Sequence, residues 1–269
     1  MSQDTQVQKS AWEVFAPQQE FLFVPTPKWV RVYFGKTFIA DSKHARLLFE
    51  NGRLPVYYFP KEDVRMDLLK PSDHKSHSRL FGQASYWNIE VDGQVAKNSV
   101  WGYENPESRA ADLEGYLSFD WKKMGAWFEE GEQVFVHPHD PYHRIDMRKT
   151  TRHVRVVLGG ETVAETERAV MLFETGLPAR YYIPLLDVRM DLLSSSNHHT
   201  SCPYKGDASY YTVQVSDQVY ENIAWYYPFP HPEVGKIQNL ISFYQEQVDA
   251  LYVDGEQMGR PKTPWSKKD

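Results

Sequence analysis

The sequence predicts a mainly β protein with two similar compact β domains, each a tent-like or barrel-like sheet with short helices, produced by a tandem duplication. Three observations lead to this class. The heptapeptide DVRMDLL occurs twice, beginning at Asp63 and again at Asp187. Short segments rich in β-branched and aromatic residues alternate between apolar and polar side chains, as half-buried strands do. Glycines and an Asp-Gly pair separate these segments at intervals typical of hairpins.

The repeat extends far beyond the heptapeptide, at a constant offset of 124 residues. Val30–Leu69 aligns without gaps with Val154–Leu193, and 20 of these 40 positions are identical. The same offset pairs Gly82–Tyr103 with Gly206–Tyr227. We therefore expect a first repeat domain, a linker rich in His and Pro, and a second repeat domain, at residues 13–133, 134–153 and 154–258. Because duplicated chains often replace homodimers, we expect the domains to pair within the chain, and further oligomers are left open.

Each repeat contains segments with the pattern of strands and only brief stretches with the pattern of helices. Strands are expected at VRVYF, TFIAD and YWNIEV, which are residues 30–34, 37–41 and 86–91. Turns are expected at Gly35, Gly52 and Asp92-Gly93. Short helices are expected near Glu107–Leu113 and Pro232–Leu240. About a hundred residues of short strands per repeat must bury one face, which favours a closed or tent-like sheet.

The repeated heptapeptide is expected to be a strand. In a strand, Asp63, Arg65 and Asp67 share one face. In a helical turn the two aspartates, which are four residues apart, would become like-charged neighbours, which is unfavourable. The structural interpretation is an ion triad that ties the strand to a neighbour, and the functional one is an anion clamp with a flanking acid or base. The structural interpretation is favoured because both copies keep the triad whole.

Composition excludes several classes of protein. The net charge of −6 and the lack of a concentrated basic stretch argue against nucleic acid as a partner. The single cysteine, Cys202, excludes a disulfide within the chain, and no apolar segment has the length of a signal peptide or a membrane span. We therefore expect a cytoplasmic protein. The 17 Tyr and 8 Trp residues are typical of cores and also of pockets for organic ligands.

The copies diverge most just before a shared Ala-Ser-Tyr. Copy two reads NHHTSCPYKGDASYY from Asn197, and copy one reads DHKSHSRLFGQASYW from Asp73. Cys202 and Lys205 of copy two are thus replaced by Ser78 and Phe81.

These motifs resemble the domain-of-unknown-function 427 family, which also carries a nucleotidyltransferase-like name. Its pattern contains an "fGG..iAdS" hairpin, a Tyr-x-Pro-x-x-Asp stretch, a Cys-Pro-x-Lys-Gly-x-Ala-x-Tyr-Tyr motif and a late "n.aW.Y" segment. Copy two matches at Tyr182, Pro184, Asp187, Cys202, Pro203, Lys205, Gly206, Ala208, Tyr210, Tyr211, Asn222, Trp225 and Tyr227. Copy one matches at Tyr58, Pro60, Asp63, Gly82, Ala84, Tyr86, Asn98, Trp101 and Tyr103, and lacks the Cys-Pro-x-Lys part.

The resemblance covers nearly the whole chain and implies a compact β fold without an established reaction. The nucleotidyltransferase-like name finds no support in the residues, since there is no Gly-rich phosphate loop followed by Lys and Ser or Thr, and no paired metal carboxylates at the required spacing. A thiolate of Cys202, activated by Lys205, is one interpretation, and a small buried hydrophobic residue is the favoured one. Lys205 is expected to bind a substrate carboxylate or phosphate, or to be a solvated turn lysine.

The segment HPHDPYHRID joins the repeats and carries three histidines. With Asp140, the residues His137, His139 and His143 have donor atoms suited to zinc or iron. A polar linker is the favoured interpretation, so we expect no metal and no cofactor, and metal binding by this cluster is left open. If the linker folds over an open face, it supplies His143 or Arg144 to a site there.

Aromatic walls with a few acid and base groups predict a cofactor-independent acid/base enzyme of the isomerase, cyclase or lyase type, acting on a small, partly aromatic or apolar molecule. The alternatives are a non-catalytic small-ligand-binding protein and a nucleotide or phosphate-ester enzyme. Because copy two keeps the Cys-Pro-x-Lys segment, we expect the main pocket there. Its proton-transfer groups are expected to be Glu174, Asp187 and His198. Its substrate-binding residues are expected to be Tyr182, Arg189, Lys205, Tyr211, Trp225, Tyr227 and, from the linker, His143.

Overall fold

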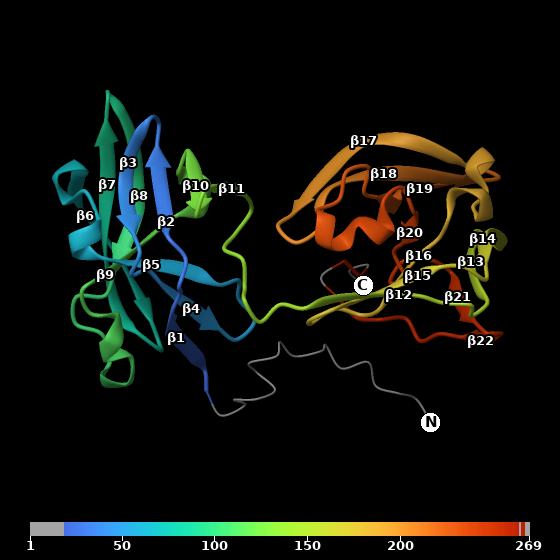
Figure 1. Cartoon of the computed structure of the whole chain (residues 1–269), viewed down its shortest axis with the longest axis horizontal. Coiled ribbons are helices and arrows are strands. Elements are labelled where there is room, and N and C mark those ends of the chain that lie inside the picture. The colour runs from blue at the N-terminus through green and yellow to red at the C-terminus, as the bar shows by residue number, and fades with distance from the viewer. Residues whose placement is uncertain (1–18, 264, 267–269) are drawn as a thin grey trace. The chain divides into compact units, whose positions relative to one another are not determined.

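A computed structural model describes residues 19–263, 265 and 266 of the chain, which divides into two compact units between Asp140 and Pro141 (Figure 1). Each unit consists mainly of antiparallel strands, with short 3-10 helices between them. The prediction of a mainly β protein with two repeated domains is therefore confirmed. No helix among the described residues is long and apolar enough to cross a membrane.

The strands of the first domain are β1 (Phe21–Pro25), β2 (Val30–Phe34), β3 (Thr37–Ser42), β4 (Arg46–Glu50), β5 (Val56–Pro60), β6 (Leu69–Ser78), β7 (Gly82–Val91), β8 (Gln94–Gly102), β9 (Tyr116–Phe119), β10 (Ala126–Glu129) and β11 (Glu132–Val134). Its 3-10 helices are η1 (Lys61–Asp63), η2 (Met66–Leu68), η3 (Ser108–Leu113) and η4 (Trp121–Lys123). The expected strands at VRVYF, TFIAD and YWNIEV are confirmed as β2, β3 and part of β7.

The strands of the second domain are β12 (Ile145–Lys149), β13 (Val154–Leu158), β14 (Glu161–Thr166), β15 (Val170–Glu174), β16 (Arg180–Tyr182), β17 (Leu193–Cys202), β18 (Gly206–Val215), β19 (Gln218–Tyr226), β20 (Ser242–Phe243), β21 (Ala250–Val253) and β22 (Glu256–Gln257). Its 3-10 helices are η5 (Leu185–Asp187), η6 (Met190–Leu192) and η7 (Pro232–Ile237). The two expected short helices are confirmed as η3 and η7.

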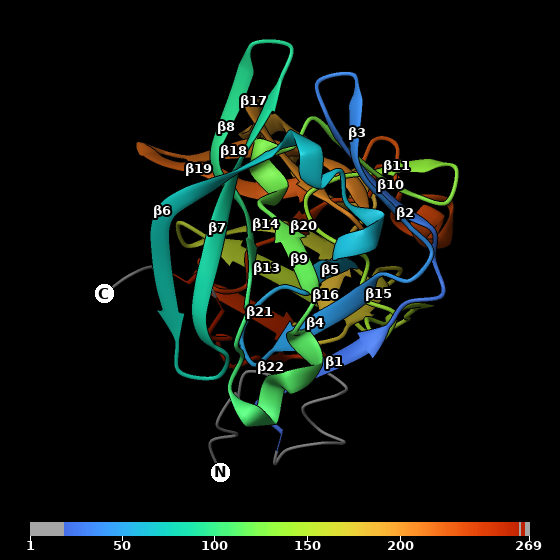
Figure 2. The ribbon, with the colours of Figure 1, turned by 90° about the vertical axis from the view of Figure 1, so that its left-hand side faces the viewer.

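The two domains share one strand order. The first contains a seven-stranded sheet, β1-β4-β5-β9-β8-β7-β6, and a four-stranded sheet, β11-β10-β2-β3 (Figure 2). In the second domain the larger sheet divides into β12-β15-β16 and β17-β18-β19-β20, connected by an isolated bridge between Ile183 and Ile241. The smaller sheet, β14-β13-β21-β22, corresponds to that of the first domain.

The expected linker, residues 134–153, includes a strand of the second domain. β12 pairs with β15, and Ile145 lies opposite Glu174. β1 pairs with β4 in the same way, with Phe21 opposite Glu50. The repeat offset therefore reaches back to β1 and β12, although their sequences differ, because the pairing depends on backbone groups rather than on particular side chains. His143 lies two residues before this strand.

The prediction that DVRMDLL is a strand is wrong. Each copy forms two 3-10 turns, η1 and η2 or η5 and η6, after Pro60 or Pro184. Between the turns, one extended residue in each copy bridges to the neighbouring strand, as Val64 does to Ala40. Pro60 and Pro184 directly precede η1 and η5 and permit a turn to start there, since the fixed φ of proline suits the start of a turn.

The turns also separate the charges that a strand would align. Asp63 accepts a hydrogen bond from Ser42 at 2.6 Å, whereas Arg65 forms a bidentate pair with Asp67 at 2.7 and 2.8 Å. The second copy repeats both contacts, with Thr166 bound to Asp187 at 2.6 Å. The motif therefore fastens η1 and η5 to their neighbouring strands, but the expected ion triad does not form, because the first aspartate of each copy is not bonded to the arginine of the motif.

A shared asparagine shapes the long hairpin of each domain. Asn98 in β8 has a φ of 49° and Asn222 in β19 has a φ of 53°, a left-handed conformation that asparagine tolerates better than most residues. The side chain of Asn98 accepts a hydrogen bond from Ser72 of β6 at 2.6 Å, and Ser196 contacts Asn222 in the same way. These contacts connect the outermost strands, β6 and β17, to strands two places away in the sheet.

Candidate functional site

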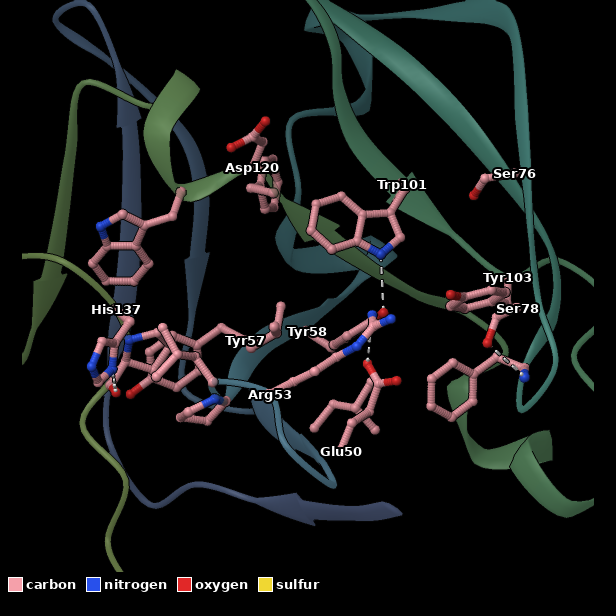
Figure 3. Close-up of a pocket in the computed structure, with 18 of the residues that line it drawn as sticks. Glu50, Arg53, Tyr57, Tyr58, Ser76, Ser78, Trp101, Tyr103, Asp120 and His137 are labelled. Carbon is pink, nitrogen blue, oxygen red and sulfur yellow. Dashed lines mark hydrogen bonds and ion pairs between the residues drawn. The ribbon is translucent and has the colours of Figure 1, made fainter. Parts of the chain in front are cut away.

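The first domain contains an open cavity of about 1180 Å³, shown in Figure 3. β4, β5, β6 and β8 and the segment around η4 contribute its lining. The lining is rich in aromatic rings, and it also contains a carboxyl group, Glu50, and a guanidinium group, Arg53. The lining thus combines aromatic walls with many polar and charged groups, and aromatic walls are typical of pockets for small organic ligands.

Glu50 is the last residue of β4, and its side chain is 17% exposed. The chain turns after it through Gly52, whose φ of +72° is a conformation that glycine adopts without strain. The turn is closed by a hydrogen bond from the Arg53 backbone to the Glu50 carbonyl at 3.1 Å, and it places Arg53 Nη1 3.6 Å from Glu50 Oε1 (Figure 3). Burial raises the pKa of Glu50, and the Arg53 charge only partly opposes that rise.

Tyr58, Trp101 and Tyr103 form the aromatic wall next to this carboxyl group. Trp101 Nε1 donates to the Tyr58 hydroxyl at 3.1 Å, with the two rings edge to face (Figure 3). Burial and the nearby Glu50 carboxylate raise the pKa of Tyr103 to about 12, and burial raises the pKa of Tyr58 well above its usual value. Both tyrosines are therefore neutral hydroxyls at physiological pH, available as hydrogen-bonding groups.

A second group of aromatic residues lines the opposite end of the cavity. Trp121 stacks on Trp127, with ring centroids 4.3 Å apart and an angle of 6° between the planes. Asp120 and His137 lie at this end in Figure 3, away from Tyr103. The cavity therefore offers aromatic rings at both ends, with Glu50 and Asp120 among its acidic groups.

In the second domain the equivalent glutamate, Glu174, is bonded within the protein. Its carboxylate contacts Lys205 Nζ and lies 3.0 Å from His143 Nε2. Lys205 and Glu174 are both buried, and His143 stacks on Tyr204 with ring centroids 4.0 Å apart. Burial by itself would raise the pKa of Glu174, but the hydrogen bond from His143 and the charge of Lys205 outweigh it and hold the pKa below its usual value.

A second buried ion pair occupies positions equivalent to two residues of the first-domain cavity. Arg180 binds Glu246 through both guanidinium Nη atoms, one at 2.7 Å, and both side chains are at most 6% exposed. These positions correspond, at the repeat offset, to the cavity residues Val56 and Lys122. Thr263 also donates to Glu246 at 2.6 Å. Side chains that would line an open cavity here are therefore bonded to one another.

Six of the ten predicted site residues come together. Tyr182, Trp225 and Tyr227 belong to one buried cluster, in which Trp225 Nε1 donates to the Tyr182 hydroxyl at 3.2 Å. Burial raises the pKa of Tyr227, and the nearby Glu174 contributes to the rise. The six are His143, Glu174, Tyr182, Lys205, Trp225 and Tyr227. The expectation that the segment before β12 supplies His143 to a site in the second domain thus agrees with its contact to Glu174.

Three of the other four predicted residues lie elsewhere. Asp187 is bound by Arg168 at 2.8 Å and by Thr166, and these bonds lower the pKa of Asp187. Arg189 forms its bidentate pair with Asp191 in an exposed position. Tyr211 stacks on Tyr226 and packs against a different core cluster, because neighbouring residues of β18 point to opposite faces.

His198 lies at the margin of the buried aromatic cluster. It contacts Tyr210 edge to face at 4.6 Å, and His74 contacts Tyr86 in the first domain at the same distance. The corresponding hydroxyl contacts are also kept, from Tyr210 to Thr200 and from Tyr86 to Ser76. The participation of His198 in a reaction stays a prediction, as it does for the other predicted site residues.

The histidines near the domain junction have different partners. The His139 backbone donates to Glu129 at 3.2 Å, whereas His143 contacts Glu174. Within residues 19–263, 265 and 266, no group of three or more His, Cys, Asp or Glu side chains is arranged to hold a metal ion. Cys202 is half-buried and lies close enough to Tyr182 and Tyr227 to influence them electrostatically.

Sequence reasoning missed the open cavity of the first domain. The loss of Cys-Pro-x-Lys from copy one pointed to the second domain, yet the same substitution, Phe81 for Lys205, leaves Glu50 without the buried ammonium partner that Glu174 has. The sequence does contain a signal of this difference between the domains, because copy two has charged residues of opposite sign at positions where copy one has other residues. Arg180, Lys205 and Glu246 stand where copy one has Val56, Phe81 and Lys122.

Comparisons with known proteins agree with the duplicated architecture. No curated protein matches the chain. One family model matches twice, at residues 22–130 and 146–254, and together these segments span most of the chain and one β domain each. The chain therefore belongs to the family described as a domain of unknown function (DUF427) and contains two copies of that domain.

Proposed function

We propose that the first domain is an acid/base enzyme of the isomerase, cyclase or lyase type, which binds a small, partly aromatic organic molecule in its open cavity. The observation that carries the proposal is Glu50, a carboxyl group in the wall of an aromatic cavity whose pKa is raised by burial. A general acid or base works best when its pKa lies near the working pH, and burial is the usual means of moving a carboxyl group in that direction.

The cavity walls support binding of a flat ligand. Trp101 and Trp121 offer ring faces or edges at two places, and Tyr58 and Tyr103 offer neutral hydroxyl groups near Glu50. Aromatic pairs add about 0.5–1.5 kcal/mol beyond the burial of their area. A ligand with one or two rings can therefore be held mainly by apolar contacts while a polar substituent faces the acid.

The second domain supports this assignment by contrast. Glu174 is held as a carboxylate by Lys205 and His143, so a proton is hard to place on it near neutral pH. Buried ion pairs of this kind add rigidity and make each partner dependent on the other. We assign the acid/base role to Glu50 and a mainly structural role to the pair of Glu174 with Lys205.

Proton transfer can be tested before the reaction is identified. The full chain is incubated in D2O with a panel of aromatic ketones, aromatic acids and nucleotides, and NMR records both binding and loss of C–H signals. We expect a ring-bearing compound to bind and to exchange a C–H proton, and Glu50→Gln to slow that exchange by about 10²-fold or more without loss of binding. The control is Glu62→Gln, which removes an exposed carboxyl group of the same domain.

Each other outcome points elsewhere. Binding of ring compounds without any exchange contradicts catalysis and favours a non-catalytic ligand-binding protein. Binding of nucleotides alone favours a phosphate-ester enzyme. Exchange that is equally fast in Glu50→Gln refutes the role given to Glu50.

A further inference from the structure

Arg53 stands out among the charged groups of the first-domain cavity. Its side chain is 72% exposed, and the 3.6 Å separation from Glu50 is too long for a good hydrogen bond. Glu50 is the only ion-pair partner found for Arg53 among the described residues. The guanidinium therefore keeps donors for a planar, two-oxygen acceptor, which is the geometry that arginine recognises best.

Two of the three other Lys and Arg side chains of the lining, Arg79 and Lys123, already have protein partners. Arg79 binds Glu20. Lys123 lies 3.3 Å from Asp120 and also contacts the carbonyls of Lys97 and Asn98. Arg53 is thus the guanidinium that adjoins the acid and has its donors available.

The fold does not need an arginine at this position. In the second domain Leu177 occupies the equivalent place and forms the same turn, with its backbone donating to the Glu174 carbonyl at 3.1 Å. Arg53 donates to Glu50 at the same distance. A charged side chain that the turn does not require, beside the open cavity and next to its acid, is explained by a ligand.

We propose that the substrate of the first-domain cavity is an aromatic or partly apolar carboxylic acid, whose carboxylate binds the guanidinium of Arg53 while Glu50 takes up a proton. This inference rests on the proposed function for the position of the cavity and its acid. A substrate carboxylate on Arg53 places a second negative charge near Glu50, and a like charge nearby raises the pKa of a carboxyl group further. Burial already raises the pKa of Glu50, so Glu50 is the group in this domain that we expect to take up the proton.

The groups facing Glu50 are consistent with this direction of proton uptake. They are Arg53, whose charge lowers the pKa of Glu50, and the neutral hydroxyls of Tyr58 and Tyr103. When a substrate carboxylate engages Arg53, the cation no longer favours ionised Glu50 as strongly. Binding an anion thus prepares Glu50 to act as a general acid, with the proton supplied by solvent.

The test compares an anionic probe with its neutral analogue by calorimetry on the full chain. 2-Naphthoate and 2-naphthamide are titrated near pH 7 in two buffers with different ionisation enthalpies, which reports the protons taken up on binding. We expect 2-naphthoate to bind more tightly than 2-naphthamide. Binding of 2-naphthoate should be accompanied by uptake of a proton by the protein, and binding of 2-naphthamide should not. Arg53→Leu, which copies the second domain, should weaken 2-naphthoate by about tenfold to a hundredfold and leave 2-naphthamide unchanged.

Two further variants separate the outcomes. Glu50→Gln should keep 2-naphthoate binding and abolish proton uptake, and Leu177→Ala should change neither quantity. Equal affinity for the two probes, or equal weakening of both by Arg53→Leu, overturns the anionic substrate but leaves the cavity and its acid in place. Binding of neither probe by folded protein overturns both the inference and the proposed position of the site. Selective 2-naphthoate binding without C–H exchange supports the anion site and contradicts catalysis alone.

Discussion

Glu50 and Glu174 end equivalent strands of the two domains, yet their surroundings have opposite effects. Glu50 lines an open cavity with Arg53 Nη1 3.6 Å from its carboxyl group, and burial raises the pKa of Glu50. Glu174 forms an ion pair with Lys205 and a hydrogen bond with His143, and these contacts lower the pKa of Glu174 although it is well buried. The same carboxyl group therefore has a raised pKa in one copy and a lowered pKa in the other. The difference depends on the charged neighbours that each copy has.

The largest expected effect concerns the buried pair of the second domain. Glu174→Gln leaves the ammonium of Lys205, which is 9% exposed, without a counter-charge, and we expect a loss of about 3–5 kcal/mol in the free energy of unfolding. Urea denaturation followed by tryptophan fluorescence measures the change, and hydrogen exchange assigns it to the second domain. The matched variant Glu50→Gln should show no such loss.

The partner residue provides the control for this prediction. Lys205→Met combined with Glu174→Gln removes both charges, so the double variant should recover much of the stability that the single variant loses. If Glu174→Gln alone is as stable as the wild type, the two glutamates do not differ in the way described.

The tryptophans offer a second comparison with a smaller difference. Trp225 is 7% exposed in its cluster, and Trp225→Ala should cost about 3 kcal/mol or more in the free energy of unfolding. Trp101 makes the same bond to a tyrosine but lines the open cavity, so Trp101→Ala should cost less stability and weaken 2-naphthoate binding. Denaturant melts and calorimetry of both variants check this, and equal stability losses without any change in binding would contradict it.

The pH dependence of stability should differ in sign between the domains. The folded-state pKa of Glu174 lies below the unfolded value of about 4.3, so its stabilisation is present above that pH and is lost as the pH falls through the lowered pKa. The folded-state pKa of Glu50 is raised, so its stabilisation is present below about pH 4.3 and is lost as the pH rises through the raised pKa. Glu50→Gln should therefore stabilise the first domain near neutral pH and change little in acid.

Melting curves of the wild type and Glu50→Gln between pH 3 and 8, resolved by domain with hydrogen exchange, provide the measurement. A Glu50→Gln variant that is less stable than the wild type at neutral pH would mean that the ionised carboxylate stabilises the fold.

The parts of the fold that were predictable from the sequence are those with a local or a repeated signal. The identical spacing of the copies gave the duplication, and alternation gave strands such as β2 and β3. The heptapeptide was misassigned because alternation of charged and apolar residues fits a strand, whereas the preceding proline and a bridge to a distant strand determine the turns. Periodicity contains no information about such a bridge.

The candidate site was predictable only in part. The sequence analysis named Glu174, Lys205 and His143 as site residues. Both Lys205 and His143 lie 31 positions from Glu174 and bond to it, so the charges that suggested a binding site are paired within the protein. The bond between Arg180 and Glu246 joins residues 66 positions apart, and no local pattern reveals it. The first domain has Val56 and Lys122 at these positions, in the lining of its open cavity, which becomes visible only when the two copies are compared position by position.

The smallest effect is expected at the residues where the copies agree. Asp63 and Asp187 each accept a hydrogen bond from the neighbouring strand, and Asp187 also binds Arg168, which is exposed. Because exposed pairs contribute little, Asp63→Asn and Asp187→Asn should each cost about 1 kcal/mol in denaturant melts, with the loss for Asp187→Asn slightly larger. Neither change should alter 2-naphthoate binding by the first-domain cavity, since each residue holds a 3-10 turn to the neighbouring strand. A loss of binding or of C–H exchange in Asp187→Asn, with stability kept, would instead give that residue the catalytic role that its sequence motif suggested.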